Sequence, residues 1–189
     1  MNTNAVPPSR RPRIYLAGPD VFFLESREIF QALKAQCERL GMVGVEPSDG
    51  GIAEGFDGTD DEKAQRIYEG NIALIREADG VIANLMSFRG HEPDSGTVFE
   101  VGFAVALGKP VVAYGVEEGS YAERVSAAVP CRPDAEGVMR EAGNGLMVEG
   151  LGQRLNLMLT RSAALEADAG AALARLAGLL ESVKRQGAA

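Results

Sequence analysis

Short apolar segments alternate with segments of helical periodicity, and this alternation constrains the fold more than any other feature. Alternating strands and helices are typical of an α/β domain with a parallel sheet. One segment, Val81–Leu85, is apolar except for Asn84, which indicates a strand buried on both faces. We predict a flavodoxin-like, doubly wound α/β sheet, mostly parallel, with about five strands and helices on both faces. The expected strands are 13–19, 42–45, 81–85 and 111–114, and the expected helices are 26–40, 61–78 and 94–107.

The chain has 189 residues, a length that fits one domain with a sizeable core. We expect residues 1–12 to be a flexible polar lead and residues 13–160 to form the domain. Residues 161–189 are expected to form a C-terminal helix, beginning near residue 162, that packs on it. The segment after Glu117 contains two prolines and several glycines, so we expect it to be a loop. A second long loop, rich in glycine and aspartate, is expected at 48–60.

Composition excludes several classes of protein. The net charge of −8 argues against a partner that is a nucleic acid polymer, because such proteins carry a basic stripe. No apolar run approaches the roughly 20 residues that span a membrane, and the first residues lack the apolar segment of a secretory signal. Cys37 and Cys131 have no metal-ligand spacing and the chain has one histidine, so we expect no metal. These features favour a cytoplasmic protein and leave a small-molecule ligand open.

The candidate site begins at the run from Asp94 to Gly102. Asp94 and Glu100 are two carboxylates six residues apart, at the start of an apolar helix. The positive partial charge of a helix N-terminus favours ionised carboxylates, and paired carboxylates suit glycosyl chemistry. Because the carboxyl ends of parallel strands meet at one edge, we expect 15–19, 84–94 and the segment after Tyr114 to converge there.

Five stretches of the chain carry a resemblance to a known family. They occur in the family's order across roughly residues 13 to 160, and together they resemble the nucleoside 2-deoxyribosyltransferases. The stretches are IYLAGP (14–19), ADGVIANL (78–85), FRGHEPDSGT (88–97), FEVG (99–102) with ALGKP (106–110), and VEGLG (148–152) with LNLML (155–159).

The resemblance implies transfer of a 2-deoxyribosyl group between nucleobases, without a metal or other cofactor. Glu100 matches the nucleophile that forms a covalent deoxyribosyl ester. Asp79 and Asp94 match acidic residues at the base end, and Tyr15 matches a hydroxyl that orients the nucleophile. Asn156 matches an asparagine that a neighbouring subunit lends to the deoxyribose pocket, which implies a homo-oligomer.

Five further residues are expected to contact substrate: Gly18, Phe88, Arg89, Gly96 and Met158. Phe88 and Arg89 could stack on the base, could line its rim, or could be ordinary surface loop residues.

Plain structural interpretations compete with several of these roles. Asp94 is also a common type of helix cap, and Tyr15 is also a common strand aromatic. We interpret Asn71, which shares a helix face with Ile67 and Leu74, as a hydrogen-bonded structural asparagine. We expect His91 to fix the geometry of its loop.

Three alternatives compete with a transferase that acts in nucleotide salvage on deoxynucleosides and free nucleobases. The first is a hydrolase of deoxynucleosides or of deoxynucleoside 5′-monophosphates, although Asp94 would repel a phosphate. The second is a phosphoribohydrolase, whose Pro-Gly-Gly-x-Gly-Thr-x-x-Glu motif is matched here only from Gly96 to Glu100. The third is a non-catalytic nucleotide-binding sensor.

Overall fold

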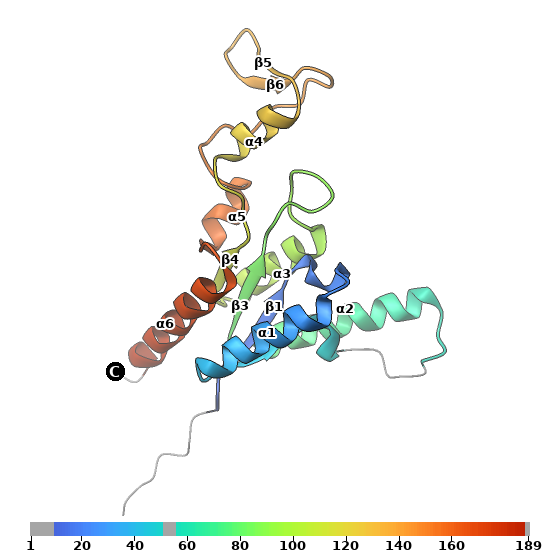
Figure 1. The fold of residues 1–189 in the computed structure, drawn as a ribbon, viewed down its shortest axis with the longest axis vertical. Helices are drawn as coiled ribbons and strands as arrows, with labels where there is room; N and C mark the ends of the chain where they lie inside the picture. Colours follow the sequence, from blue (N-terminus) through green and yellow to red (C-terminus); the bar gives the residue numbers. More distant parts are fainter. Residues whose placement is uncertain (1–9, 51–55, 188–189) are drawn as a thin grey trace, which may run out of the picture.

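The computed structural model describes residues 10–50 and 56–187 and contains a five-stranded parallel sheet with the order β2-β1-β3-β4-β7. Helices cover both of its faces (Figure 1). The predicted α/β architecture is confirmed. The strands are β1 (Arg13–Ala17), β2 (Val43–Val45), β3 (Gly80–Asn84), β4 (Val111–Tyr114) and β7 (Ala164–Leu165).

Side-chain alternation along β1 explains the two layers of helices. Ile14 and Leu16 point into one core with α1 and α6, whereas Tyr15 and Ala17 point into the opposite core with α2, α3 and α5. All four side chains are buried, as expected for a central parallel strand. The helices are α1 (Ser26–Arg39), α2 (Asp60–Glu77), α3 (Ser95–Ala106), α5 (Leu157–Ser162) and α6 (Ala169–Gly187), with short 3₁₀ turns η1 (Pro19–Phe22) and η2 (Pro47–Gly50).

Local sequence signals set the ends of these helices. Gly41, with φ 71°, follows the end of α1 in a conformation that glycine adopts readily. Thr59 and Glu62 form a capping box at the start of α2. Asp94 is the N-cap of α3, and its carboxylate accepts a hydrogen bond from the backbone N–H of Thr97.

The predicted loop after Glu117 is wrong, because that segment contains a helix and a hairpin. α4 (Tyr121–Ala128) begins with a capping box between Ser120 and Glu123, and the strands β5 (Cys131–Pro133) and β6 (Met139–Glu141) pair antiparallel. These elements project from one end of the α/β layers as an arm, residues 117–154 (Figure 1). The arm lies outside the main cores except at its base, so it lacks the long apolar periodicity that reveals core elements.

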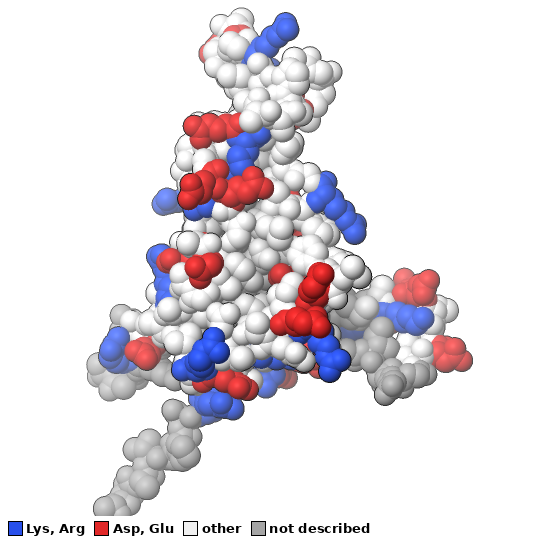
Figure 2. Space-filling view, in the orientation of Figure 1, with Lys and Arg blue, Asp and Glu red and all other residues white. Residues whose placement is uncertain are grey.

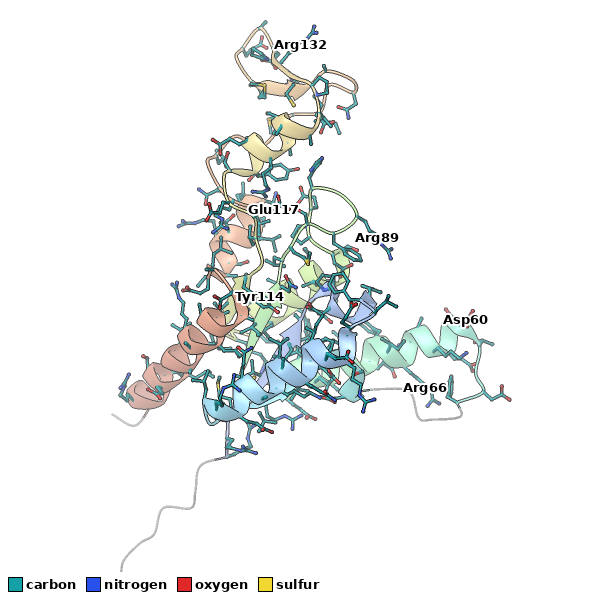
Figure 3. All side chains as sticks on the ribbon, in the orientation of Figure 1. Asp60, Arg66, Arg89, Tyr114, Glu117 and Arg132 are labelled. Atoms are coloured by element: carbon teal, nitrogen blue, oxygen red, sulfur yellow. The ribbon has the colours of Figure 1, made fainter. Side chains whose placement is uncertain are left out.

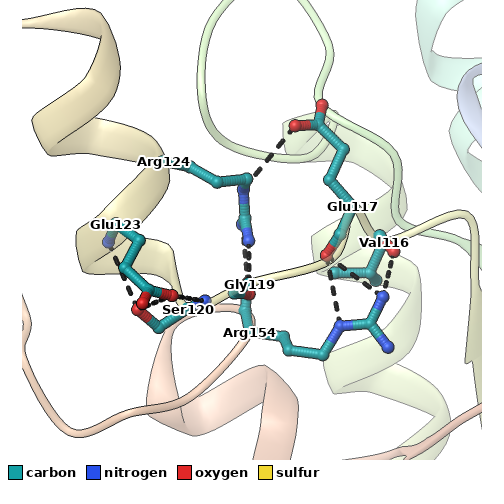
Figure 4. Close-up of polar contacts among 7 residues, drawn as sticks. All are labelled: Val116, Glu117, Gly119, Ser120, Glu123, Arg124 and Arg154. Carbon is teal, nitrogen blue, oxygen red and sulfur yellow. Dashed lines mark hydrogen bonds and ion pairs between the residues drawn. The ribbon is translucent and has the colours of Figure 1, made fainter.

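Two arginines bind the ends of the arm together (Figure 4). The Arg154 guanidinium donates to the backbone carbonyls of Val116 and Glu117. Arg124 donates to the carbonyls of Gly119 and Arg154, the latter at 2.6 Å. The arm therefore leaves and rejoins the domain at a single fixed base.

The end of the chain also differs from the expectation. A helix was predicted from about residue 162, but residues 164–165 form β7 beside β4, and α6 begins only at Ala169. A two-residue strand is too short to show a period, so the sequence merges it with the helix. The α6 helix packs against β3 and β4.

Some expectations fall outside the described residues, namely most of the N-terminal lead and the centre of the 48–60 loop. Within the described chain, no helix is both long and apolar enough to cross a membrane. On the face shown in Figure 2, Lys and Arg side chains are interspersed with Asp and Glu and form no continuous stripe.

Candidate functional site

A cavity of about 580 Å³ opens at the carboxyl ends of the strands, beside the loops that follow β1, β2 and β3. The chain winds in opposite directions from β1 and β3, so this crevice is the topological switch point of the sheet, where ligands bind in open α/β folds. The residues that line the cavity are Gly18, Val21, Phe22, Pro47, Ser48, Gly50, Ile67, Asn71, Asp94, Gly96, Thr97 and Glu100.

Glu100, in the second turn of α3, is held through one of its two oxygens. Tyr15 Oη donates to Oε1 at 2.6 Å, and Asn71 Nδ2 approaches the same oxygen at 3.4 Å. Among the described residues, no hydrogen bond reaches Oε2, and Glu100 lines the cavity. The arrangement fixes the carboxylate and leaves one oxygen available to a ligand.

Burial raises the pKa of Glu100 to about 7, and the nearby charge of Asp94 adds to the increase. The hydrogen bonds from Tyr15 and Asn71 oppose the increase, because they stabilise the ionised form. The pKa of Tyr15 is raised above its usual value by burial and by the adjacent Glu100. The phenol therefore stays protonated and can keep donating to the carboxylate.

Asp94 serves as a helix cap and also lines the cavity. Its Oδ2 accepts hydrogen bonds from the backbone N–H of Thr97 at 2.9 Å and from the Thr97 hydroxyl at 3.0 Å. No described residue donates to its Oδ1. The cap interpretation and the site interpretation are thus compatible, because each uses a different oxygen.

The two glycines expected at the site both line the cavity. A Cβ on Gly96 would lie 3.1 Å from Asp94 Oδ2, and a Cβ on Gly18 would lie only 2.2 Å from Asp20 Oδ2. A side chain at either position would disturb a carboxylate beside the cavity, and at Gly18 the overlap is severe.

Phe22 forms an aromatic wall that the sequence interpretation missed. It lines the cavity with 59% of its surface exposed, and its ring stacks on Phe88 with centroids 5.4 Å apart. Arg89, on the loop after β3 (Figure 3), places its guanidinium 4.8 Å from the Phe88 ring and 5.7 Å from the Phe22 ring. Phe88 and Arg89 therefore back the wall and do not line the cavity. An aromatic residue in the turn that follows a buried strand was the available signal.

Asp79 lies at the other end of the sheet. It precedes β3, and its carboxylate accepts hydrogen bonds from the backbone N–H of Arg13 at 2.7 Å and from the Arg10 guanidinium at 3.0 Å. Arg13 is the first residue of β1, so Asp79 occupies the amino edge and is not brought together with Glu100.

Asn71 is the polar residue that the structure does bring to Glu100. We interpreted it as structural, but it contacts the carboxylate and lines the cavity. Its own Oδ1 is buried without a hydrogen-bond partner among the described residues. The signal was an amide on an otherwise apolar helix face.

Asn156 and Met158 lie on the outer side of α3, along a separate groove of about 610 Å³. Asn156 is the N-cap of α5, where it accepts from Met158 N at 2.9 Å and donates to Glu149 at 3.0 Å. Met158 is 71% exposed. Within one chain, neither residue lines the cavity that contains Glu100.

Among the described residues, the cavity is lined by neither a metal-binding group nor the single histidine. Among residues 10–50 and 56–187, no three His, Cys, Asp or Glu side chains are grouped to hold a metal ion. His91 is exposed on the loop after β3 and does not line the cavity.

Comparison with known proteins places this geometry in a family context. Residues 14–158 match the family model described as nucleoside 2-deoxyribosyltransferase. A solved 2-deoxyribosyltransferase from Leishmania mexicana is 30% identical, with a TM-score of 0.70 over 88% of this chain and 97% of that one. A conserved protein from Enterococcus faecalis shares the fold at 19% identity, with a TM-score of 0.55 over 94% of this chain and 99% of that one.

A curated relative is also similar over part of its length. An uncharacterised protein of Schizosaccharomyces pombe is 36% identical over 121 residues, which are 62% of this chain and 56% of that protein. The chain thus matches little more than half the length of that relative. The family model, however, extends over most of the chain and includes Tyr15, Asn71, Asp94 and Glu100. The chain belongs to the nucleoside 2-deoxyribosyltransferase family.

Proposed function

We propose that the protein exchanges nucleobases on 2′-deoxyribonucleosides through a covalent ester on Glu100. The observation that carries this proposal is the asymmetry of the Glu100 carboxylate, in which Tyr15 and Asn71 hold Oε1 while Oε2 is free toward the cavity. A fixed carboxylate with one free oxygen suits attack on an anomeric carbon.

In the first half-reaction, Glu100 Oε2 forms a bond to C1′ while the bond between C1′ and the base nitrogen breaks. The bonding electrons leave with the base, and Asp94, in its protonated form, supplies a proton through Oδ1. In the second half-reaction, another base loses a proton to Asp94 and attacks C1′, which releases Glu100. Exchange of one base for another follows, with ping-pong kinetics.

The cavity lining supports nucleosides over nucleotides as substrates. Among the described residues that line it, none is Lys or Arg, and two are the carboxylates Asp94 and Glu100. A 5′-phosphate would meet negative charge with no cation to offset it. The apolar side chains of Val21, Phe22 and Ile67 offer a surface for a planar base.

We further propose that the working enzyme is a homo-oligomer in which Asn156 completes the site of a neighbouring subunit. Asn156 and the exposed Met158 lie away from Glu100 within one chain, and the family resemblance assigns the asparagine to the partner's deoxyribose pocket. The proposal predicts that an isolated subunit has an incomplete sugar pocket.

The decisive experiment incubates the protein with deoxyinosine and free adenine and follows the products by chromatography. Formation of deoxyadenosine supports transfer. Glu100→Gln should abolish product formation and leave the fold intact, and mass spectrometry of the wild type during turnover should find a deoxyribosyl adduct on Glu100. An adduct on another residue, or turnover by Glu100→Gln, would reject Glu100 as the nucleophile.

Hydrolysis is the second candidate, and the exposure of the aromatic wall favours it. Phe22 is 59% exposed, so water can enter the cavity of a single chain and reach an ester on Glu100. The same chromatogram separates the two reactions, because hydrolysis yields hypoxanthine and free deoxyribose without deoxyadenosine. Unchanged deoxyinosine would instead support a sensor.

A further inference from the structure

A buried carboxylate–amide pair joins the two strands that border the cavity. Asn84 Nδ2, at the end of β3, donates to Asp20 Oδ1 at 3.1 Å and to Oδ2 at 3.2 Å. Asp20 belongs to the loop after β1, and the two residues are only 5% and 7% exposed. The pair thus connects the loop after β1 to the end of β3 at the switch point, where the loops after these two strands diverge.

Asp20 lies next to Gly18, one of the residues that line the cavity. Gly18 lines the cavity, and a Cβ on Gly18 would lie 2.2 Å from Asp20 Oδ2 and 2.9 Å from the Asn84 Cβ. The Asp20 carboxylate therefore lies against Gly18, whose backbone lines the cavity. The glycine is required here because of close approach.

No cation neutralises this carboxylate within the described chain. None of the ion pairs formed by residues 10–50 and 56–187 includes Asp20. Burial raises its pKa, whereas the Asn84 amide and a backbone N–H lower it. Its charge also contributes to the raised pKa of the nearby Tyr114, at the end of β4 (Figure 3).

A buried carboxylate makes this contact at a cost in desolvation free energy. Burying an unpaired charge is unfavourable, and an asparagine could accept the hydrogen bond from Asn84 without that penalty. A perturbed carboxylate beside a ligand crevice is a candidate for a functional role. The charge itself is therefore the feature that needs an explanation.

We propose that Asp20 supports the reaction electrostatically from behind Gly18, where its negative charge favours the positive charge that develops on the deoxyribosyl group as the base departs. The inference rests on the proposed deoxyribosyl transfer. Fixed charges aimed at developing charge in a water-poor site lower the barrier without reorganisation. Asp20 does not touch the substrate, and Asn84 holds it in place.

The test compares Asp20→Asn with the exchanged pair Asp20→Asn/Asn84→Asp, and uses the exposed Asp61→Asn as the matched control for loss of one negative charge. Asp20→Asn should lower kcat by about tenfold or more, with little change in KM for the base. Its melting temperature should be equal to or above that of the wild type, because a buried charge has been removed. Asp61→Asn should leave kcat unchanged.

The exchanged pair separates the charge from the hydrogen bond. It keeps a carboxylate–amide contact but places the carboxylate on β3, farther from Gly18, so we expect wild-type stability with kcat between those of Asp20→Asn and the wild type. Wild-type kcat in either variant would overturn the proposal, as would a loss of kcat in Asp20→Asn that accompanies a loss of stability or folding. A wild-type protein that neither transfers nor hydrolyses would instead reject the proposed function, so the two failures are distinguishable.

Discussion

Tyr15 and Glu100 lie 85 positions apart in the sequence, and the Tyr15 hydroxyl donates a 2.6 Å hydrogen bond to Glu100 Oε1. The contact joins a central strand to the second turn of α3. Because Tyr15 is fully buried in the core, its hydroxyl is a rigid reference point for the carboxylate. This hydrogen bond lowers the pKa of Glu100, whereas burial raises it, and the balance of the two determines when Glu100 is ionised.

Activity should rise with pH through about 7 in the wild type, because Glu100 must be ionised to attack and its pKa is raised to about 7. Tyr15→Phe removes a hydrogen bond that lowers this pKa, so the rising limb should move to higher pH. We expect about a tenfold lower kcat/KM at pH 6.5 and a smaller loss at pH 9. Profiles of kcat/KM against pH check this, with Tyr121→Phe in the arm as the control. An unshifted limb in Tyr15→Phe would contradict the assignment.

The raised pKa of Glu100 also predicts how stability depends on pH. Between the usual carboxyl value of 4.5 and about 7, the folded state holds a proton that the unfolded state has lost. The free energy of unfolding therefore falls as pH rises through this window. Glu100→Gln removes that loss, so its melting temperature should exceed the wild type by about 2–6 °C at pH 8.5 and by less at pH 5.5. Thermal melts at both values test this, and an equal difference at the two would refute it.

Asp94 allows its capping role to be separated from its proposed acid role. Asparagine caps helices as well as aspartate does, so Asp94→Asn should keep stability, whereas Asp94→Ala should lose about 1 kcal/mol. Both should lower the rate of exchange by about a hundredfold, since neither can supply a proton.

Denaturant unfolding and exchange assays measure these two properties independently. The exchange defect should shrink for a donor whose base departs without protonation. Full exchange activity in Asp94→Asn would remove Asp94 from the reaction.

Subunit mixing tests whether Asn156 acts across an interface. Glu100→Gln and Asn156→Ala should each be nearly inactive as pure samples. When the two are unfolded together and refolded as a mixture, some sites combine an intact Glu100 from one subunit with an intact Asn156 from the other. Activity should then recover to about a quarter of the wild type for a dimer, by random pairing. No recovery, or a fully active monomer in sedimentation, would exclude the shared site.

The elements predicted correctly are those in which the pattern of apolar residues in the sequence indicates which positions are buried. The strands β1, β3 and β4 are apolar apart from Arg13 at the start of β1 and Asn84 at the end of β3, and α1 shows a clear apolar face. The strand β7 was missed because two residues carry no period. The strand depends on pairing with β4, which is a contact that the local sequence does not encode.

Site prediction failed where it ignored which edge of the sheet a residue occupies. Asp94 follows β3 and reaches the carboxyl edge, whereas Asp79 precedes β3 and must lie at the amino edge. Both are acidic and close to the same strand, so residue type alone could not distinguish them. Asn71 was interpreted as structural, because a helix position gives no indication of which distant carboxylate its side chain will meet.

Because the arginine contacts fix the base of the arm, the hairpin at its far end can become longer or shorter without changing how the arm is attached. The Arg154 guanidinium donates hydrogen bonds to the carbonyls of Val116 and Glu117, 38 and 37 positions away. These contacts hold the two ends of the arm together whatever the length of the arm. We expect that shortening the turn at 134–138 leaves the melting temperature almost unchanged, while Arg154→Ala lowers it clearly. An equal loss from both changes would show that the tip, too, supports the domain.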